Sequence, residues 1–274
     1  MKTKTALTLA VILGLITYSL PLYAATNKAY HVEERTVIEI PVVGKITTLT
    51  SSYLSGCKLK ETTLIKMHNT LVKMISDSDG KSQEILLSDL CDKIRWRYDE
   101  NKQVYSSVSF EEVRQERVRQ EAENELQIDM ESDQNDIDDS PRLTHEIMGY
   151  EKNINGFKAR KVVTRVYVKS IDNPIIIEEY YAADTKPLKK ITVAREKVAQ
   201  EMGAGDNHID GVPGFIMAAY DGMRQDKELA RPEGEVVRFV ISLLDNDDDP
   251  IFSMKYDVLK AEKIAYQPDH FALK

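Results

Sequence analysis

The histidines of this sequence do not match the spacing of a known catalytic motif. The five histidines are His31, His68, His145, His208 and His270. There is no G-x-S-x-G nucleophile motif, and His145-Glu146 lacks the second histidine of the zinc motif H-E-x-x-H. A Ser-His-Asp triad depends on the fold and cannot be recognised from spacing alone. We therefore predict a protein that is not an enzyme, and a hydrolase without a recognisable motif stays as a second alternative.

Two acidic runs resemble calcium loops without matching them. Residues 206–211 place Asp and Gly at EF-hand positions, but Met217 stands where the closing glutamate belongs. Residues 245–249 offer alternating oxygens, but Pro250 replaces the glycine. The glycines between residues 203 and 214 lack the G-x-G-x-x-G spacing that cradles a phosphate after a strand. We expect solvated acidic turns, with no metal ligands and no cofactor.

Residues 1–24 have the pattern of a secretory signal peptide. Lys2 and Lys4 form its positive start. The apolar run Ala6–Leu20 is interrupted and shorter than the ~20 residues that span a bilayer. Ala24 is a small residue suited to cleavage, and no cysteine follows it for lipid attachment. We expect an exported periplasmic protein of the bacterial envelope, soluble after cleavage and without a transmembrane segment.

The charge balance argues against polyanionic partners. The formal net charge is −8, and it becomes −10 when Lys2 and Lys4 leave with the signal peptide. Binding to nucleic acid or to an anionic membrane surface needs clustered Lys and Arg. No such cluster stands out along the chain, so the sequence predicts neither partner.

Cys57 and Cys91 are the only cysteines. An even number in an oxidising compartment permits one disulfide, which would close a loop of ~34 residues. Because both cysteines are predicted on neighbouring strands, a bridge and two buried thiols are both open interpretations. There is no C-x-x-C pair, which argues against a redox or zinc role.

The stretch Ile85–Phe110 predicts three short antiparallel strands joined by two turns. Its middle strand alternates with a period of two, as a half-buried strand does. One set of alternate residues is Ile94, Trp96 and Tyr98, and the other is Lys93, Arg95 and Arg97. We expect the aromatic set to face the core and the cationic set to face solvent.

The remaining chain predicts further strands and a few helices. Strands are expected at 37–43, 46–53, 54–61, 142–150, 161–169, 175–182, 188–193, 237–243 and 252–258, and helices at 64–75, 196–202 and 213–223. For 64–75 a long irregular excursion is the alternative to a helix. Ser109 is placed to cap a charged helix that leads into an acidic insert at about 110–140. Nine acidic residues and no basic ones lie between Glu121 and Asp139.

Strands with short connections before and after the insert favour an antiparallel sheet over repeated βαβ units. The predicted fold class is α+β: a strongly curved antiparallel sheet, or open half-barrel, with helices on its concave face. We expect a single domain over residues 25–274.

Several short motifs resemble a family of uncharacterised secreted bacterial proteins related to the periplasmic lipoprotein-carrier superfamily, the LolA, LolB and RseB type of fold. The motifs are Asp89…Lys93-Ile94-Arg95-Trp96…Lys102…Tyr105 with Phe110-Glu111-Glu112, Ile154-Asn155-Gly156-Phe157-Lys158-Ala159-Arg160-Lys161, Val166-Tyr167-Val168 and Phe271-Ala272-Leu273. Ala159 departs from the cysteine that is frequent at its position. The helix predicted at 64–75 and the loop after Gly203 are also less typical of the family. The resemblance implies a half-barrel whose cavity receives acyl chains or a regulatory partner.

The sequence thus favours a non-enzymatic periplasmic binding protein, with an acyl chain, lipid or lipoprotein as its apolar ligand. The residues expected to line the cavity are Ile94, Trp96, Tyr98, Phe110, Phe239, Ile241, Phe252, Met254 and Tyr256. By default the same side chains would fill a core. The alternative is an envelope interaction or stress-sensing module that docks a protein partner through the acidic helix. In that case, deleting residues 111–139 should abolish the partner's capture and leave the fold intact.

Overall fold

The structure is a computed structural model that describes residues 28–41, 44–68, 80–99, 103–128, 142–167, 173–203, 229–245 and 249–272. The predicted signal peptide lies outside these ranges, as do the helix predicted at 213–223 and the first candidate calcium loop at 206–211.

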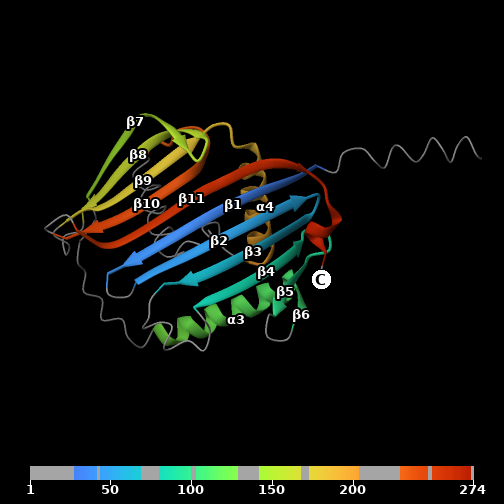
Figure 1. The fold of residues 1–274 in the computed structure, drawn as a ribbon. Coiled ribbons are helices and arrows are strands. Elements are labelled where there is room, and N and C mark those ends of the chain that lie inside the picture. The colour runs from blue at the N-terminus through green and yellow to red at the C-terminus, as the bar shows by residue number, and fades with distance from the viewer. Residues whose placement is uncertain are drawn as a thin grey trace, which may run out of the picture.

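One antiparallel sheet of eleven strands organises the chain (Figure 1). Its strands are β1 (Lys28–Ile40), β2 (Gly44–Ser55), β3 (Lys58–Met67), β4 (Lys81–Asp89), β5 (Ile94–Asp99), β6 (Val104–Ser109), β7 (Arg142–Ile154), β8 (Phe157–Tyr167), β9 (Ile175–Ala182), β10 (Glu235–Leu244) and β11 (Pro250–Ala265). Their order in space is β6-β5-β4-β3-β2-β1-β11-β10-β9-β8-β7. Because β6 and β7 are both edge strands, the sheet is open.

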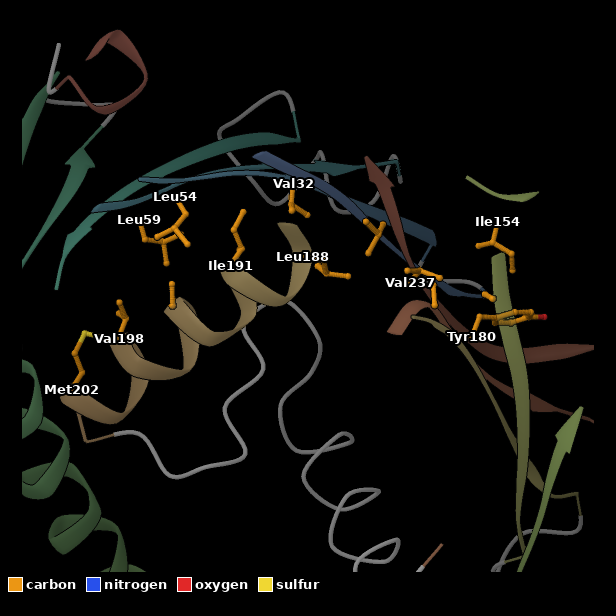
Figure 2. Packing of buried hydrophobic residues seen from close by; sticks show 14 of the residues in the cluster. Val32, Leu54, Leu59, Ile154, Tyr180, Leu188, Ile191, Val198, Met202 and Val237 are labelled. Carbon is orange, nitrogen blue, oxygen red and sulfur yellow. The ribbon is translucent and has the colours of Figure 1, made fainter. Parts of the chain in front are cut away.

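In the described part of the chain, two helices and a short 3₁₀ turn accompany the sheet. They are α3 (Phe110–Ile128), α4 (Lys186–Glu201) and η1 (Pro268–Phe271). The sheet curves around α4, which lies in its hollow (Figures 1 and 2). We call the side that α4 covers the concave face and the opposite side the convex face. The prediction of a curved antiparallel sheet with a helix on its concave face is confirmed.

Local chemistry explains where α3 begins. The Ser109 hydroxyl accepts a hydrogen bond from the Glu112 backbone N–H at 3.1 Å, and Glu112 Oε2 accepts one from the Ser109 backbone N–H at 2.7 Å. This reciprocal pair is a capping box. The expected cap at Ser109 is confirmed.

The helix α4 corrects a prediction. Residues 188–193 were expected as a strand and 196–202 as a short helix, but α4 is one helix of 16 residues. Its buried side is made by Leu188, Ile191, Ala194, Val198 and Ala199. This spacing follows the helical period, and burial on the sheet outweighs the weak helix propensity of the β-branched Ile191-Thr192-Val193.

Two further boundaries differ from the prediction. Residues Leu64–Met67 continue β3 and pair with β2, whereas they were expected to open a helix. The rest of that predicted helix lies outside the described residues. Cys57 and Cys91 also lie in the turns after β2 and β4, rather than on the strands.

Strand register decides which side chains face α4, and it overturns the expectation for β5. Paired residues of an antiparallel ladder point to the same face. Trp96 pairs with Leu87, Leu87 with Lys60, and Lys60 with Tyr53. The Tyr53 ring packs against His270 of η1, opposite to α4. Ile94, Trp96 and Tyr98 therefore lie on the convex face, and Arg95 and Arg97 on the concave one.

Candidate functional site on the concave face

The first apolar cluster fills the space between α4 and the sheet (Figure 2). Ile191 and Val198 project from the helix toward Val32, Leu54 and Leu59 of the strands. All five side chains are buried. This cluster is a packed core between α4 and the central strands.

A buried polar network crosses this core. Arg195 of α4 donates from Nη1 and Nη2 to the two carboxylate oxygens of Glu34, at 3.0 and 2.5 Å, and from Nε to Glu61 Oε1 at 2.7 Å. Its Nη2 also lies 2.8 Å from the Ser52 hydroxyl. The Tyr256 hydroxyl donates to Glu34 Oε1 at 2.6 Å. Helix α4 is thereby joined to β1, β2 and β3 by charge-assisted hydrogen bonds, and through Glu34 to Tyr256 of β11.

The charges in this network hold one another ionised. Burial alone raises the pKa of Glu34, but the charge and hydrogen bonds of Arg195 outweigh it, so this pKa lies below its usual value. Burial alone lowers the pKa of Arg195, yet Glu34 and Glu61 raise it well above its usual value. Burial and the Glu34 charge raise the pKa of Tyr256 well above its usual value. Tyr256 is therefore a neutral donor and no base is poised near pH 7.

Acid titration should expose the contribution of Glu34. Since its pKa is depressed on folding, the stability it adds is fully present above its ordinary pKa of 4.5. That contribution is lost as the pH falls through the folded-state pKa. A Glu34→Gln variant is expected to be less stable than the wild type above pH 4.5, with a deficit that narrows in acid. Urea unfolding across a pH series measures this difference.

The matched control is Glu146→Gln, at an exposed carboxylate of β7. Its small effect on the free energy of unfolding should change little over the same pH range. A Glu34→Gln deficit that stays constant down to the acid limit would contradict the assignment.

A second apolar cluster lies farther along the concave face. It consists of Val166, Ile177, Phe239, Ile241 and Met254, with Ile38, Leu143, Ile175, Val236, Phe252 and Tyr256 packed against it. Every member comes from β1 or from β7–β11. In the described part of the chain, neither α3 nor α4 contributes to it. It is an apolar sheet face that the helices do not reach.

The network separates the two clusters. Tyr256 packs against both of them, and its hydroxyl points to Glu34. Among the described residues, the concave face thus has one half filled by α4 and another half lined by strands, with buried charge at the boundary between them.

The predicted lining residues divide among these regions. Phe110 is 2% exposed and belongs to the first cluster, beside the start of α3. Phe239, Ile241, Phe252, Met254 and Tyr256 come together in the second cluster. Ile94, Trp96 and Tyr98 lie on the convex face, where Tyr98 packs against Tyr105 with ring centroids 5.1 Å apart.

Sequence reasoning missed the Arg195 network. A signal was present, because Arg195 stands between Ala194 and Val198 on the buried side of an amphipathic helix. A charged residue at such a position requires a buried partner. The glutamates that pair with it are 161 and 134 residues away, so only the fold identifies them.

A disulfide joins Cys57 to Cys91, with their Cα atoms 5.6 Å apart. It stands beside a pocket of about 610 Å³ at the carboxyl end of α4. The residues that line this pocket are Gly56, Cys57, Leu90, Lys93, Arg114, Lys197, Gln200 and Glu201. Lys93 is paired with Glu201, and Arg114 with Glu111. These ion pairs neutralise much of its charge, and we assign no ligand to it.

Ser51, His31 and Glu262 on the convex face are connected in the same sequence of contacts as a serine hydrolase triad. His31 Nε2 lies 3.0 Å from the Ser51 hydroxyl, and His31 Nδ1 lies 3.3 Å from Glu262 Oε1. However, Ser51 is in the middle of β2, whose backbone is paired with β1 and β3. No free N–H in this part of the sheet can form an oxyanion hole. The Tyr53 ring also stacks on His31 with centroids 4.4 Å apart. We interpret the triad as a structural cross-strand network.

The described residues show neither a metal site nor a membrane-spanning helix. Over these ranges no group of three His, Cys, Asp or Glu side chains is placed to hold an ion. In the turn between β10 and β11, the Asp245 carboxylate instead accepts a hydrogen bond from the Asp249 N–H at 2.9 Å. Within the same ranges no helix is long and apolar enough to cross a membrane.

Comparison with known proteins gives structural likeness only. No family model matches the chain, and no curated protein is similar to it. A LolA superfamily protein from Nitrosomonas europaea has 6% identity and a TM-score of 0.27, covering 90% of both chains. A putative outer membrane lipoprotein-sorting protein domain from Vibrio parahaemolyticus has 9% identity and a TM-score of 0.26, again covering 90% of each.

A DUF1329 family protein from Desulfovibrio piger has 10% identity and a TM-score of 0.25, over 91% of this chain and 92% of that one. At such TM-scores the likeness carries no part of the argument for function, which rests on the residues of this chain.

Proposed function

We propose that this protein is an exported, non-enzymatic binding protein that holds an apolar chain against the second cluster of its concave face. The observation that carries the proposal is the composition of that cluster. Phe239, Ile241 and Met254 form a buried apolar layer on the strands, to which neither described helix contributes. Half-buried Phe252 and Ile175 extend it toward the end of the sheet.

The chemistry of this surface fits an acyl chain. Its lining is aliphatic and aromatic, so affinity would come from apolar burial at ~25 cal/mol per Å². A flexible chain can follow a curved sheet, whereas a rigid polar ligand would leave its hydrogen bonds unmade. The Arg195 charge is matched by Glu34 and Glu61, which leaves it no free charge to offer an acidic headgroup. We therefore expect the apolar tail to supply most of the affinity.

Fatty-acid binding to delipidated protein tests the proposal. A dansyl-labelled fatty acid is expected to bind saturably and to be displaced by unlabelled palmitate. Replacing Phe252 by Ser removes an aromatic ring from the lining, and the affinity should fall roughly tenfold. Fluorescence titration measures both values.

The control is Val118→Ser, which removes an apolar side chain that is 61% exposed on α3. It should leave the affinity unchanged. Delipidated protein that binds no fatty acid, and whose melting temperature no phospholipid or lipopeptide alters, would refute the proposal.

A further inference from the structure

The convex face carries a concentration of positive charge that the sequence does not reveal. Arg35 of β1, Lys66 of β3, Lys81 of β4, Arg238 of β10 and Lys255 of β11 share this face by register. We call these five residues the convex cationic surface. They are separated by up to 220 positions in a chain of net charge −8. The sheet alone brings them together.

One carboxylate lies among the five cations. Asp257 is buried, with 1% of its side chain exposed. It accepts from Arg35 Nη2 at 2.9 Å and from Arg238 Nε at 2.5 Å, and Lys255 Nζ lies 3.5 Å away. Burial alone raises the pKa of Asp257, but these cations bring it below its usual value. A single buried anion cannot neutralise three cations, and the excess charge faces outward.

Lys66 and Lys81 strengthen this imbalance. They stand directly opposite each other in the β3–β4 ladder. Like charges in such a pair destabilise a sheet. Among the described residues, neither ammonium has a carboxylate within ion-pair distance. Because this repulsion costs stability, we infer that the two lysines serve to bind an anionic partner.

The neighbouring charges do not cancel the surface. At its margins, Lys161 pairs with Glu178 at 2.9 Å, and Lys45 pairs with Glu39 at 2.5 Å. Each of these pairs is neutral by itself. Between the cations lie the half-buried aliphatic side chains Val37, Leu49, Leu64 and Val240. The surface is thus cationic and moderately apolar at once.

We propose that the convex cationic surface docks the protein on an anionic lipid bilayer. Lysine-rich surfaces bind such bilayers through charge density, without a shaped pocket. Aliphatic side chains between the cations suit the boundary of headgroups and acyl chains. The five cations are spread across the sheet from β4 to β10, a breadth that suits a membrane surface better than an acidic peptide. The concave face would stay accessible, and the proposal holds whether or not that face binds a lipid.

Vesicle sedimentation with the full chain tests this docking. Wild-type protein is expected to sediment with vesicles of phosphatidylcholine and phosphatidylglycerol in equal parts, but not with phosphatidylcholine alone. Binding should weaken as salt is added. The double variant Lys66→Glu/Lys81→Glu should lower the partition coefficient by about tenfold or more. Since it keeps a like-charged pair in the ladder, its stability should stay near that of the wild type.

The matched control is Lys190→Glu/Lys197→Glu, which makes the same change in net charge on exposed positions of α4. It should bind the anionic vesicles nearly as well as the wild type. Equal losses in the two double variants, or no wild-type binding to the anionic vesicles, would overturn the proposal. Capture of polyglutamate without vesicle binding would also overturn it, in favour of an acidic protein partner.

Discussion

An Arg195→Met variant is expected to lose about 3–5 kcal/mol of the free energy of unfolding. The substitution leaves Glu34 and Glu61 buried without the guanidinium that pairs with both. Desolvated carboxylates without a partner are among the most destabilising defects in a protein core. Because Arg195 also links α4 to the sheet through buried hydrogen bonds, α4 should detach first. Urea unfolding followed by circular dichroism measures the loss.

Two further variants make this prediction specific. Lys197→Met removes a cation from the exposed side of the same helix and should change stability by less than about 0.5 kcal/mol. Arg195→Met combined with Glu34→Leu and Glu61→Leu replaces the three charged groups of the network by apolar ones and should recover much of the loss. If Arg195→Met were no more destabilising than Lys197→Met, the network would not hold the helix.

Removing the disulfide should have an effect of similar size by a different physical route. The Cys57→Ser/Cys91→Ser variant opens a loop of 34 residues. In the chain-entropy model this costs about 3–4 kcal/mol, mostly by enlarging the unfolded ensemble. The two turns that the bridge joins also lie next to the start of α3. Urea unfolding of the variant, and of wild-type protein with and without reductant, measures the loss.

The comparison with reductant serves as the control for this prediction. Reduced wild-type protein and the double serine variant should have equal midpoints, and reductant should leave the variant unchanged. Reduced and oxidised wild-type proteins that unfold at the same urea concentration would show that the bridge adds no stability.

Periodicity predicted much of the strand framework. In β10 and β11, apolar residues at alternate positions identify both strands and the face they share. Such a signal is local, because a strand between a core and solvent imposes a period of two on its own residues. The capping box at Ser109 is local in the same way.

The sequence was a poorer guide to which face of a strand points toward the core. For β5 the more apolar set, which includes Trp96, lies on the convex face. There Trp96 pairs with Leu87, which is 3% exposed. On the concave face, Arg95 Nε instead donates to the Ser88 hydroxyl at 3.1 Å. The face of a strand follows from register with its neighbours, and a single strand does not contain that information.

The site depended even more on long-range pairing. The second cluster gathers side chains from six strands, and the Arg195 network joins α4 to four. Residue types indicated that Phe239, Phe252 and Met254 are core-forming, but not which of them α4 covers. The convex cationic surface was invisible in the sequence for the same reason, since no two of its five residues are adjacent in the chain.

The pairing of β1 with β11 has a consequence for how the molecule assembles. Strands β1–β6 and β7–β11 are two meanders in which nearly all neighbours are close in sequence. The seam between them joins residues as distant as His31 and Glu262. Closing so long a loop is entropically costly, so this seam should form late. Until it does, β1 and β11 each have one unpaired edge. Glu34 then also lacks the hydrogen bond that the Tyr256 hydroxyl of β11 donates to it in the folded protein. The last strand to be synthesised thus completes the middle of the sheet.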